Sequence, residues 1–217
     1  MCMLALDHIV VAATNAEELS AMYGNQFTIK SIKGGQHNDW GTHNYLSYFS
    51  NDSYIEWLGS YDKDKSNKAD NPLIKHLMHV LDHNIVGPFQ FALRTTQLDD
   101  YVDHFIEQDI PFEGPISAMR EKPDGSLLKW RMLFPTYDHE SEVLPFLIEW
   151  DDPREAYPDT SLLNTQTIRQ INYGGIDRET FTKIYQLKPK KLNKNHFPLQ
   201  NSKIFFTDNK KLEFDLI

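Results

Sequence analysis

Apolar and polar positions along the chain repeat in one order: a strand-like run, a helical run, and further strand-like runs. The first copy opens at residues 6–12, LDHIVVA, and its last strand is expected at 54–57, YIEW. The second opens at residues 89–94, FQFALR, and its last strand is expected at 147–150, LIEW. Repetition of this kind indicates modules that bury their apolar faces against one another.

The helical runs of the copies also align. Moving 82 residues along the chain places Leu19 on Tyr101 and Tyr23 on Phe105. A spacing of four puts each pair on one side of a helix. The alignment therefore does not depend on the strands alone.

Polar residues mark where these helices should begin. Thr14 or Asn15 is expected to cap the first helix and Thr96 the second, because short polar side chains accept hydrogen bonds from free N–H groups. Pro72 is expected to open another helix over residues 73–83, since proline suits the first helical position.

The copies divide the chain into modules that each contain a strand, a helix and two or three further strands. The first module spans residues 3–60 and the second 87–151, with a linker that carries a helix at 61–86. After a second linker at 152–166, a weaker copy fills residues 167–217. We therefore predict an α+β fold of repeated βαβββ modules, the third of them shorter.

Four polar residues stand at matched places in the first and last strands of the two full copies: His8, Glu56, Gln90 and Glu149. Side chains alternate across a strand, so all four are expected on the faces opposite the bulky apolar residues. An imidazole, an amide oxygen and two carboxylates could share one divalent cation. This donor set favours a five- or six-coordinate ion such as Mn²⁺, Fe²⁺, Ni²⁺, Mg²⁺ or Zn²⁺.

An arrangement without metal competes with this one. Glu56 and Glu149 could pair with Arg94 or Arg131 in buried salt bridges, because a buried carboxylate needs a partner. His8 could likewise be a strand histidine that is hydrogen-bonded inside a core. The residues alone leave both readings open.

Composition limits the classes of partner. The chain has 217 residues and a formal net charge of −9, which argues against nucleic acid or an anionic membrane surface as the main partner. It contains no run of about 18 apolar residues. Its only cysteine is Cys2, so no intramolecular disulfide can form. We expect a cytoplasmic protein that binds a small-molecule substrate.

Several short segments complete the pattern: LDHIVV at 6–11, GGQH at 34–37, GTHN at 41–44, YIEW at 54–57, LRTT at 93–96, PDG at 123–125, WR at 130–131 and PFLIEW at 145–150. Together they resemble the glyoxalase-like domain family of the vicinal oxygen chelate superfamily. The resemblance covers most of the chain. It implies that two βαβββ modules pair into a cup-shaped mixed sheet.

The resemblance also implies a site. Superfamily enzymes typically bind a metal at the positions held here by His8, Glu56, Gln90 and Glu149. The metal would act as a Lewis acid on two neighbouring oxygens of the substrate. By likeness to glyoxalase I, Glu149 would move the substrate proton, with Glu56 as the second catalytic carboxylate.

Candidate substrate-binding residues surround these positions. The resemblance would place His37, Trp40 and Asn44 at the mouth of the cup, although locally this stretch is typical of a glycine-bearing hairpin loop. Arg94 would anchor a carboxylate or phosphate, because its planar guanidinium binds such anions through two hydrogen bonds. Arg131 is a further candidate.

A histidine group lies outside this site. His76, His79 and His83 recur on one side of the helix expected after Pro72. They could bind a metal, but the pattern favours an exposed amphipathic helix.

The third copy poses a packing question, because modules of this kind bury themselves in pairs. Its Gln170 and Glu213 match the ligand positions, yet one module supplies only half a site. It could pack on an outer sheet face or pair with its counterpart in a second chain. We predict a homodimer.

Two functions fit these observations. The first is a divalent-metal-dependent enzyme of the lyase, isomerase or dioxygenase type, acting on a small metabolite with vicinal oxygens. The alternative is a metal-free protein that binds and sequesters an antibiotic or another organic anion in the same cup.

Overall fold

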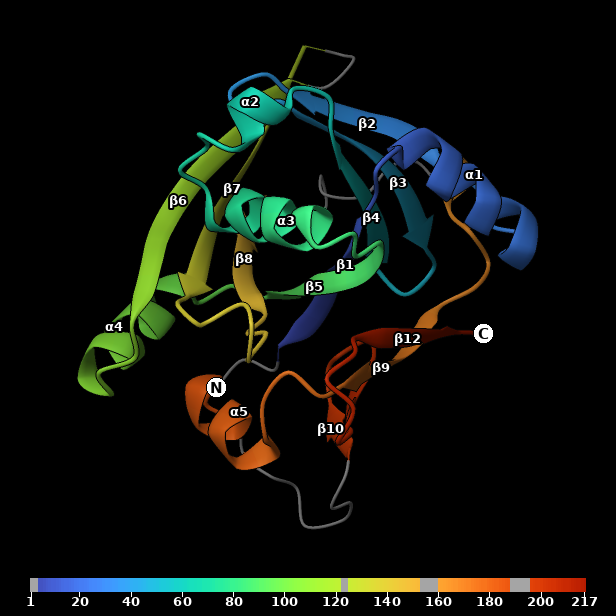
Figure 1. Cartoon of the computed structure of the whole chain (residues 1–217). Helices are drawn as coiled ribbons and strands as arrows, with labels where there is room; N and C mark the ends of the chain where they lie inside the picture. The colour runs from blue at the N-terminus through green and yellow to red at the C-terminus, as the bar shows by residue number, and fades with distance from the viewer. Residues whose placement is uncertain (1–3, 122–124, 153–159, 188–195) are drawn as a thin grey trace.

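The two full copies form the two halves of one curled eight-stranded sheet (Figure 1). This computed structural model describes residues 4–121, 125–152, 160–187 and 196–217. Cys2, most of the turn expected at 123–125, and part of the linker expected at 152–166 lie outside the described residues.

Each half contains the predicted module. The first comprises β1 (Ala5–Ala12), α1 (Ala16–Phe27), β2 (Ile32–His37), β3 (Thr42–Phe49) and β4 (Ser53–Ser60). The second comprises β5 (Gly87–Arg94), α4 (Leu98–Glu107), β6 (Phe112–Glu121), β7 (Leu127–Pro135) and β8 (Phe146–Trp150). In each, the first strand runs parallel to the last. The antiparallel pair β1–β5 joins the halves, in the order β2-β3-β4-β1-β5-β8-β7-β6. The predicted α+β fold with a cup-shaped mixed sheet is confirmed.

Apolar cores lie on both faces of this sheet. Ile9 and Val11 of β1 belong to the core on the outer face, whereas Val10 and Ala12 belong to the core inside the curl. This alternation is the one expected of a strand that is buried on both sides. Trp57 of β4 faces outward in the same way, as predicted.

The segment between the halves places a helix inside the curl. It contains α2 (Lys63–Ser66) and α3 (Pro72–Asp82), and Pro72 opens α3 as predicted. Helix α3 lies inside the curl (Figure 1). Its Ile74 and Leu77 pack into the inner core. His76 is buried too. The expectation of an exposed amphipathic helix was therefore wrong, because the curled sheet leaves an apolar hollow that α3 fills.

The helix caps were predicted in part. The side chain of Asn15 accepts hydrogen bonds from the N–H groups of Glu17 and Glu18, as expected. Thr96 does not cap α4, because the N-cap position is held by Gln97, whose side chain makes no capping bond. The described helices include none that combines the length and apolar character needed to cross a bilayer.

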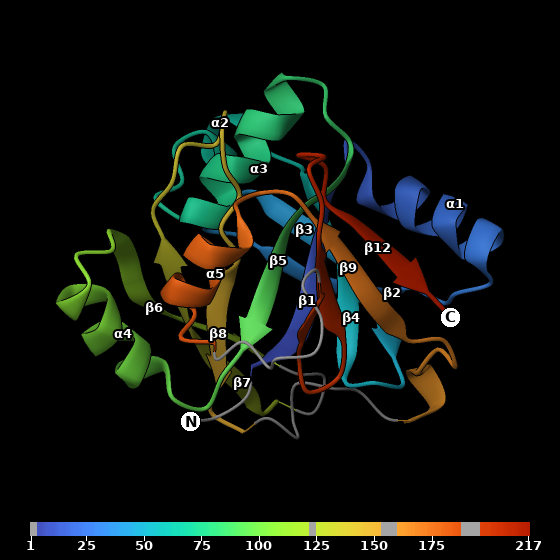
Figure 2. The ribbon, with the colours of Figure 1, turned by 90° about the horizontal axis from the view of Figure 1, so that it is seen from below.

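The C-terminal segment forms a second, four-stranded sheet. It contains a short 3₁₀ helix (Thr160–Leu162), β9 (Ile168–Tyr173), α5 (Arg178–Ile184), β10 (His196–Pro198), β11 (Lys203–Phe206) and β12 (Glu213–Leu216). The strand order is β10-β11-β9-β12. This unit covers the outer face of the large sheet (Figure 2), where Ile171 and Phe181 join the same core as Ile9 and Phe91.

The third copy is therefore only partial. Strand β12 runs antiparallel to β9 and pairs Glu213 with Asn172, whereas β4 runs parallel to β1. Glu213 does not occupy the place of Glu56, and that part of the repeat was wrong. Of the two packings considered, the structure has the outer-face one. The homodimer stays a prediction. The argument for it was that the third module lacked a partner, and this module packs against the large sheet of its own chain.

Candidate functional site

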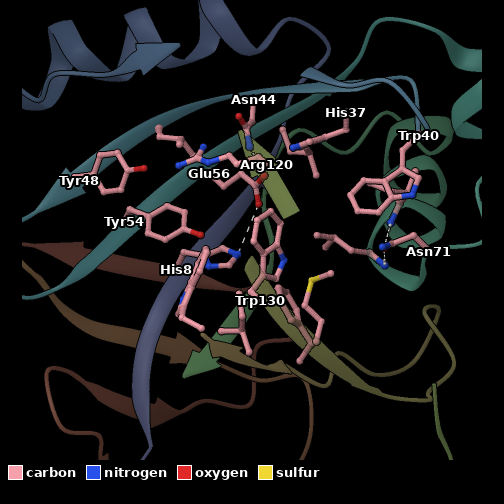
Figure 3. A pocket seen from close by; sticks show the side chains of 18 residues that line it. His8, His37, Trp40, Asn44, Tyr48, Tyr54, Glu56, Asn71, Arg120 and Trp130 are labelled. Atoms are coloured by element: carbon pink, nitrogen blue, oxygen red, sulfur yellow. Dashed lines mark hydrogen bonds and ion pairs between the residues drawn. The ribbon is translucent and has the colours of Figure 1, made fainter. Parts of the chain in front are cut away.

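Side chains from both halves and from α3 line a pocket inside the curl, here called the cup pocket (Figure 3). Its empty volume is about 690 Å³, counting the open mouth. Its apolar and aromatic lining is Trp40, Leu46, Tyr54, Leu58, Leu73, Ile74, Trp130, Met132, Phe146, Ile148 and Trp150. Its polar lining is His8, His37, Asn44, Tyr48, Glu56, Asn71 and Arg120.

A bulge in β1 brings two neighbouring side chains together. The register between β1 and β5 shifts between Leu6 and His8. Asp7 and His8 therefore do not point to opposite faces, as they would in a regular strand. Nδ1 of His8 lies 2.7 Å from Oδ1 of Asp7. An ionised carboxylate only accepts hydrogen bonds, so Nδ1 of His8 is the donor and Nε2 faces the pocket.

Asp7 is fully buried but well supplied with donors. Nε1 of Trp150 donates to its Oδ2 at 2.9 Å, and Nη1 of Arg94 lies 3.5 Å from the same oxygen. Burial raises the pKa of Asp7, but His8, Arg94 and Trp150 together lower it more, so the net pKa falls below 3.8. Asp7 is thus ionised at neutral pH and orients the imidazole of His8.

Glu56 is held in place by Asn44. Nδ2 of Asn44 donates to Oε1 of Glu56 at 2.6 Å, and its Oδ1 accepts from the N–H of Gly35 at 2.7 Å. A Cβ at Gly34 would lie only 2.1 Å from Oδ1 of Asn44, so any larger residue here would displace the Asn44 side chain. The two glycines lie in β2 and not in a loop, and they leave room for the side chain that orients Glu56.

His8 and Glu56 face one another across the pocket floor. Nε2 of His8 lies 3.6 Å from Oε2 of Glu56 (Figure 3). The ring of His8 stacks on Tyr54, with centroids 4.5 Å apart, and meets the edge of Phe146 at 5.5 Å. Only 8% of Glu56 is exposed. This is an acid–base pair in a mostly apolar environment, where electrostatic interactions are strong.

Three further polar side chains line the cup pocket: the cation Arg120 and the neutral groups Tyr48 and His37. Arg120, from β6, lines the pocket beside Tyr48. Burial raises the pKa of Tyr48, and Arg120 lowers it only in part, so the phenol stays protonated. Burial lowers the pKa of His37, while Glu56 raises it and Arg120 lowers it further. His37 is therefore mainly neutral at pH 7, with Nδ1 lying 3.0 Å from Oγ1 of Thr42.

The structure brings together four of the residues chosen from the sequence. His8, Glu56, His37 and Asn44 all line the cup pocket, and so does Trp40. Their roles stay predictions. The remaining candidates lie elsewhere: Gln90, Arg94, Arg131 and Glu149.

Glu149 lies on the opposite face of β8. It forms an ion pair with Arg131 of β7, which also donates to Asp99 at 2.9 Å. Its Oε1 accepts a hydrogen bond from the N–H of Leu98 at 3.2 Å. Glu149 therefore binds a backbone N–H in the first turn of α4. The metal-free arrangement considered from the sequence, a salt bridge between a glutamate and an arginine, is therefore the one found for Glu149 and Arg131. Neither residue lines the cup pocket.

Strand register explains why the matched motifs misled. Val10 pairs with Glu56, and Ala92, which stands 82 residues after Val10, pairs with Phe146. Phe146 is thus the counterpart of Glu56. Glu149 lies three residues further along β8, and an odd offset places a side chain on the other face of a strand. The pocket receives Ile148 and Trp150 instead.

The two candidates on β5 are also occupied elsewhere. Nε2 of Gln90 donates to the hydroxyl of Tyr137 at 2.7 Å and to the carbonyl of Leu144 at 3.0 Å, beside a separate pocket. Arg94 contacts Asp7 and donates to the carbonyl of Asp52 at 3.3 Å. Arg94 thus forms an ion pair with Asp7, which in turn contacts His8, and Arg94 does not line the cup pocket.

A four-ligand metal centre does not fit this arrangement. Only His8 and Glu56 of the four proposed donors share the pocket, and Phe146 stands where the second carboxylate was expected. Arg120 also brings a positive charge to the same end. The predicted grouping of four ligands is corrected to a pair.

Sequence reasoning missed Asp7 and Arg120. Asp7 stands beside His8, but strict alternation placed it on the other face, and only the bulge turns it inward. A carboxylate inside an apolar strand, with Arg94 on a related strand, was the available signal. Arg120 lies in a strand whose facing could not be read from a clear alternation of apolar residues.

Comparison with known families agrees with this geometry. The model of a family described as a glyoxalase-like domain matches residues 6–188. The chain belongs to this family. A search of curated proteins finds no match.

Solved structures share the fold at low sequence identity. A hypothetical protein from Staphylococcus aureus has a TM-score of 0.75 and 19% identity, over 94% of this chain and 87% of its own. Methylmalonyl-CoA epimerase from Mycobacterium tuberculosis has a TM-score of 0.52 and 18% identity, over 70% and 92%. A variant of the Streptomyces coelicolor methylmalonyl-CoA epimerase, in complex with 2-nitronate-propionyl-CoA, has a TM-score of 0.51 and 15% identity, over 70% and 100%.

Proposed function

We propose that the cup pocket is the active site of a glyoxalase-like enzyme that moves a proton on a small oxygenated metabolite. Glu56 would take the proton from a carbon beside a carbonyl or carboxylate. With both ring nitrogens protonated, His8 would donate its Nε2 proton to the neighbouring oxygen, and would take it back when Glu56 returns its proton to the carbon. The observation that carries the proposal is the chain of contacts from Asp7 through His8 to Glu56, which ends inside the pocket.

The surroundings suit this chemistry. Asp7 fixes the tautomer of His8 from behind, and Asn44 fixes one oxygen of Glu56, so the other faces the cavity. Holding an acid and a base at defined positions is how general acid–base catalysis gains its rate. The isomerase or lyase type is favoured because acid and base groups are what the pocket presents.

A substrate anion would meet Arg120. Its guanidinium is the only cationic side chain among the described pocket residues, and a planar guanidinium can bind a carboxylate through two hydrogen bonds. Trp40 and Trp130 offer flat apolar surfaces nearby. A small organic acid with neighbouring oxygens is therefore the proposed class of substrate.

The structural neighbours support the reaction type only at the level of fold. Two of them are epimerases of methylmalonyl-CoA, and epimerases invert a carbon centre. For this chain, methylmalonyl-CoA is one probe among several.

Solvent hydrogen exchange tests the proposal. The protein would be incubated in D₂O with pyruvate, 2-oxobutyrate, hydroxyacetone or methylmalonyl-CoA, and deuterium at carbon would be followed by NMR. We expect the wild type to catalyse exchange on at least one probe and Glu56→Gln to lose about 10²- to 10⁴-fold of that rate. Equal exchange by both proteins would contradict the role of Glu56.

Sequestration of an organic anion is the second candidate, and the aromatic lining with one arginine favours it equally well. Trp40, Trp130 and Trp150 allow binding to be followed by fluorescence. A probe that quenches this fluorescence with micromolar affinity, yet gains no deuterium with the wild type, would identify a binding protein. Arg120→Gln should then weaken binding, whereas Glu56→Gln should not.

A further inference from the structure

A second group of ligand-type side chains lies away from the cup pocket, around the C-terminal end of α3. His79 and His83 are four residues apart, so they share one side of the helix, with ring centroids 4.5 Å apart. Glu140, from the loop between β7 and β8, lies close to Nε2 of both rings. Its Oε1 is 3.7 Å from Nε2 of His79 and 3.9 Å from Nε2 of His83.

These spacings suit a shared ion. One ligand atom from each of the three side chains lies within 4.8 Å of the other two. A tetrahedral zinc ion with ligands at about 2.1 Å holds its donors roughly 3.4 Å apart, so small rotations of the side chains would close the site. Glu140 is largely exposed and His83 half exposed, so an ion can reach them from solvent.

The tautomer of His83 is already the one that a metal requires. Its Nδ1 lies 2.8 Å from the main-chain carbonyl oxygen of His79. A carbonyl oxygen only accepts, so Nδ1 carries the proton and Nε2 offers its lone pair toward Glu140. Metal-binding histidines typically donate their other ring N–H to a carbonyl or carboxylate in this way.

We propose that His79, His83 and Glu140 bind a divalent transition-metal ion of the zinc class. His139, whose ring centroid lies 5.6 Å from that of His79, or water would supply the fourth ligand. The ion would join α3 to the β7–β8 loop. Because Ile74 of α3 lines the cup pocket, the ion would stabilise the helix that covers the pocket without entering it.

Zinc titration of the full chain tests this site. Protein freed of metal with EDTA would be titrated with Zn²⁺ by calorimetry, and Co²⁺ would report the coordination by its visible absorption. We expect one equivalent to bind, with affinity reduced at least about tenfold in His83→Gln and Glu140→Gln. Unchanged affinity in both variants, or no binding by the wild type, would overturn the proposal.

Matched controls separate this site from the cup pocket. His104→Gln and Glu142→Gln change the same residue types outside the cluster and should leave zinc binding unchanged. His8→Gln and Glu56→Gln should also bind one equivalent. If zinc binding is lost in these two and kept in His83→Gln, the ion belongs to the cup pocket and the proposal fails. Because the readout is metal binding, this result is independent of the exchange reaction.

Discussion

Nδ1 of His8 lies 2.7 Å from Oδ1 of Asp7, although the two residues are neighbours in one strand. In a regular strand the two side chains would point to opposite faces. The bulge between Leu6 and His8 turns them toward the same side and allows the contact. Asp7 also receives a hydrogen bond from Trp150, on the last strand of the second half. The contact thus connects the centre of the sheet to the group that faces the pocket.

Removing the charge of Asp7 should affect both stability and activity. Asp7→Asn would leave Arg94 without its buried carboxylate and would offer His8 a weaker acceptor. We expect the free energy of unfolding to fall by about 2–4 kcal/mol. Urea denaturation would measure this loss. In the protein that remains folded, solvent hydrogen exchange in D₂O should be slower than in the wild type. An unchanged denaturation midpoint would show that the contact does not stabilise the protein.

Glu149 should matter for stability and not for chemistry. Glu149→Gln weakens the ion pair with Arg131 and the hydrogen bond to the N–H of Leu98, so the free energy of unfolding should fall by about 1–2 kcal/mol. Asp99→Asn, which alters the more exposed partner of Arg131, should cost less. A large loss of exchange rate in Glu149→Gln, with normal stability, would contradict this assignment.

Glycine in β2 should prove necessary at one position and not at the next. A Cβ at Gly34 would meet Oδ1 of Asn44 at 2.1 Å, whereas one at Gly35 would meet only the ring of His37 at 3.3 Å. Gly34→Ala should therefore displace Asn44 and slow exchange at least about tenfold, on the magnitude of a misplaced catalytic group. Gly35→Ala is the matched control and should retain most activity. Similar rates in the two variants would refute the role given to Gly34.

Acid should destabilise the protein through His76. Burial, and then the neighbouring His139 and His79, lower the pKa of His76 from 6.5 to about 3. Between these values the unfolded chain binds a proton at this residue and the folded chain does not. The free energy of unfolding should therefore fall as pH falls from about 6.5 toward 3, by up to about 1.4 kcal/mol per pH unit.

Denaturation at several pH values, with EDTA present, checks this slope. His76→Asn keeps an acceptor for the hydroxyl of Tyr137, which lies 3.0 Å from Nδ1 of His76, but cannot titrate. Its stability should depend less on pH over the same range. An equally steep dependence in wild type and variant would assign the acid sensitivity to other groups.

The sequence predicted the parts of the fold that follow from periodicity. The alternation around Ile9 and Val11, the capping residue Asn15 and the opening of α3 at Pro72 were all readable, because each depends on local chemistry. The position of α3 inside the curl was not readable. An amphipathic helix has the same pattern whether it covers a surface or fills a hollow.

Half of the candidate site was predicted for a related reason. His8 lies in β1 and Glu56 in β4, and these two strands pair without a register shift from His8 to Ala12. Simple alternation therefore places both side chains correctly. Glu149 was placed by matching letters in LIEW and YIEW, and letters do not record strand register. The counterpart of Glu56 is Phe146, which only the pairing of β5 with β8 reveals. The bulge at Asp7 is invisible in the same way.

The ring nitrogens of His8 offer the most direct test of the site, since they can be observed without a substrate. Long-range ¹H–¹⁵N spectra would be recorded for wild type, Glu56→Gln and Glu149→Gln, with His8→Gln to assign the signal. We expect His8 to carry its proton on Nδ1, its Nε2 signal to move in Glu56→Gln, and the same signal to stay in place in Glu149→Gln. A signal that responds to Glu149→Gln as strongly as to Glu56→Gln would contradict the pairing of His8 with Glu56 inside the cup pocket.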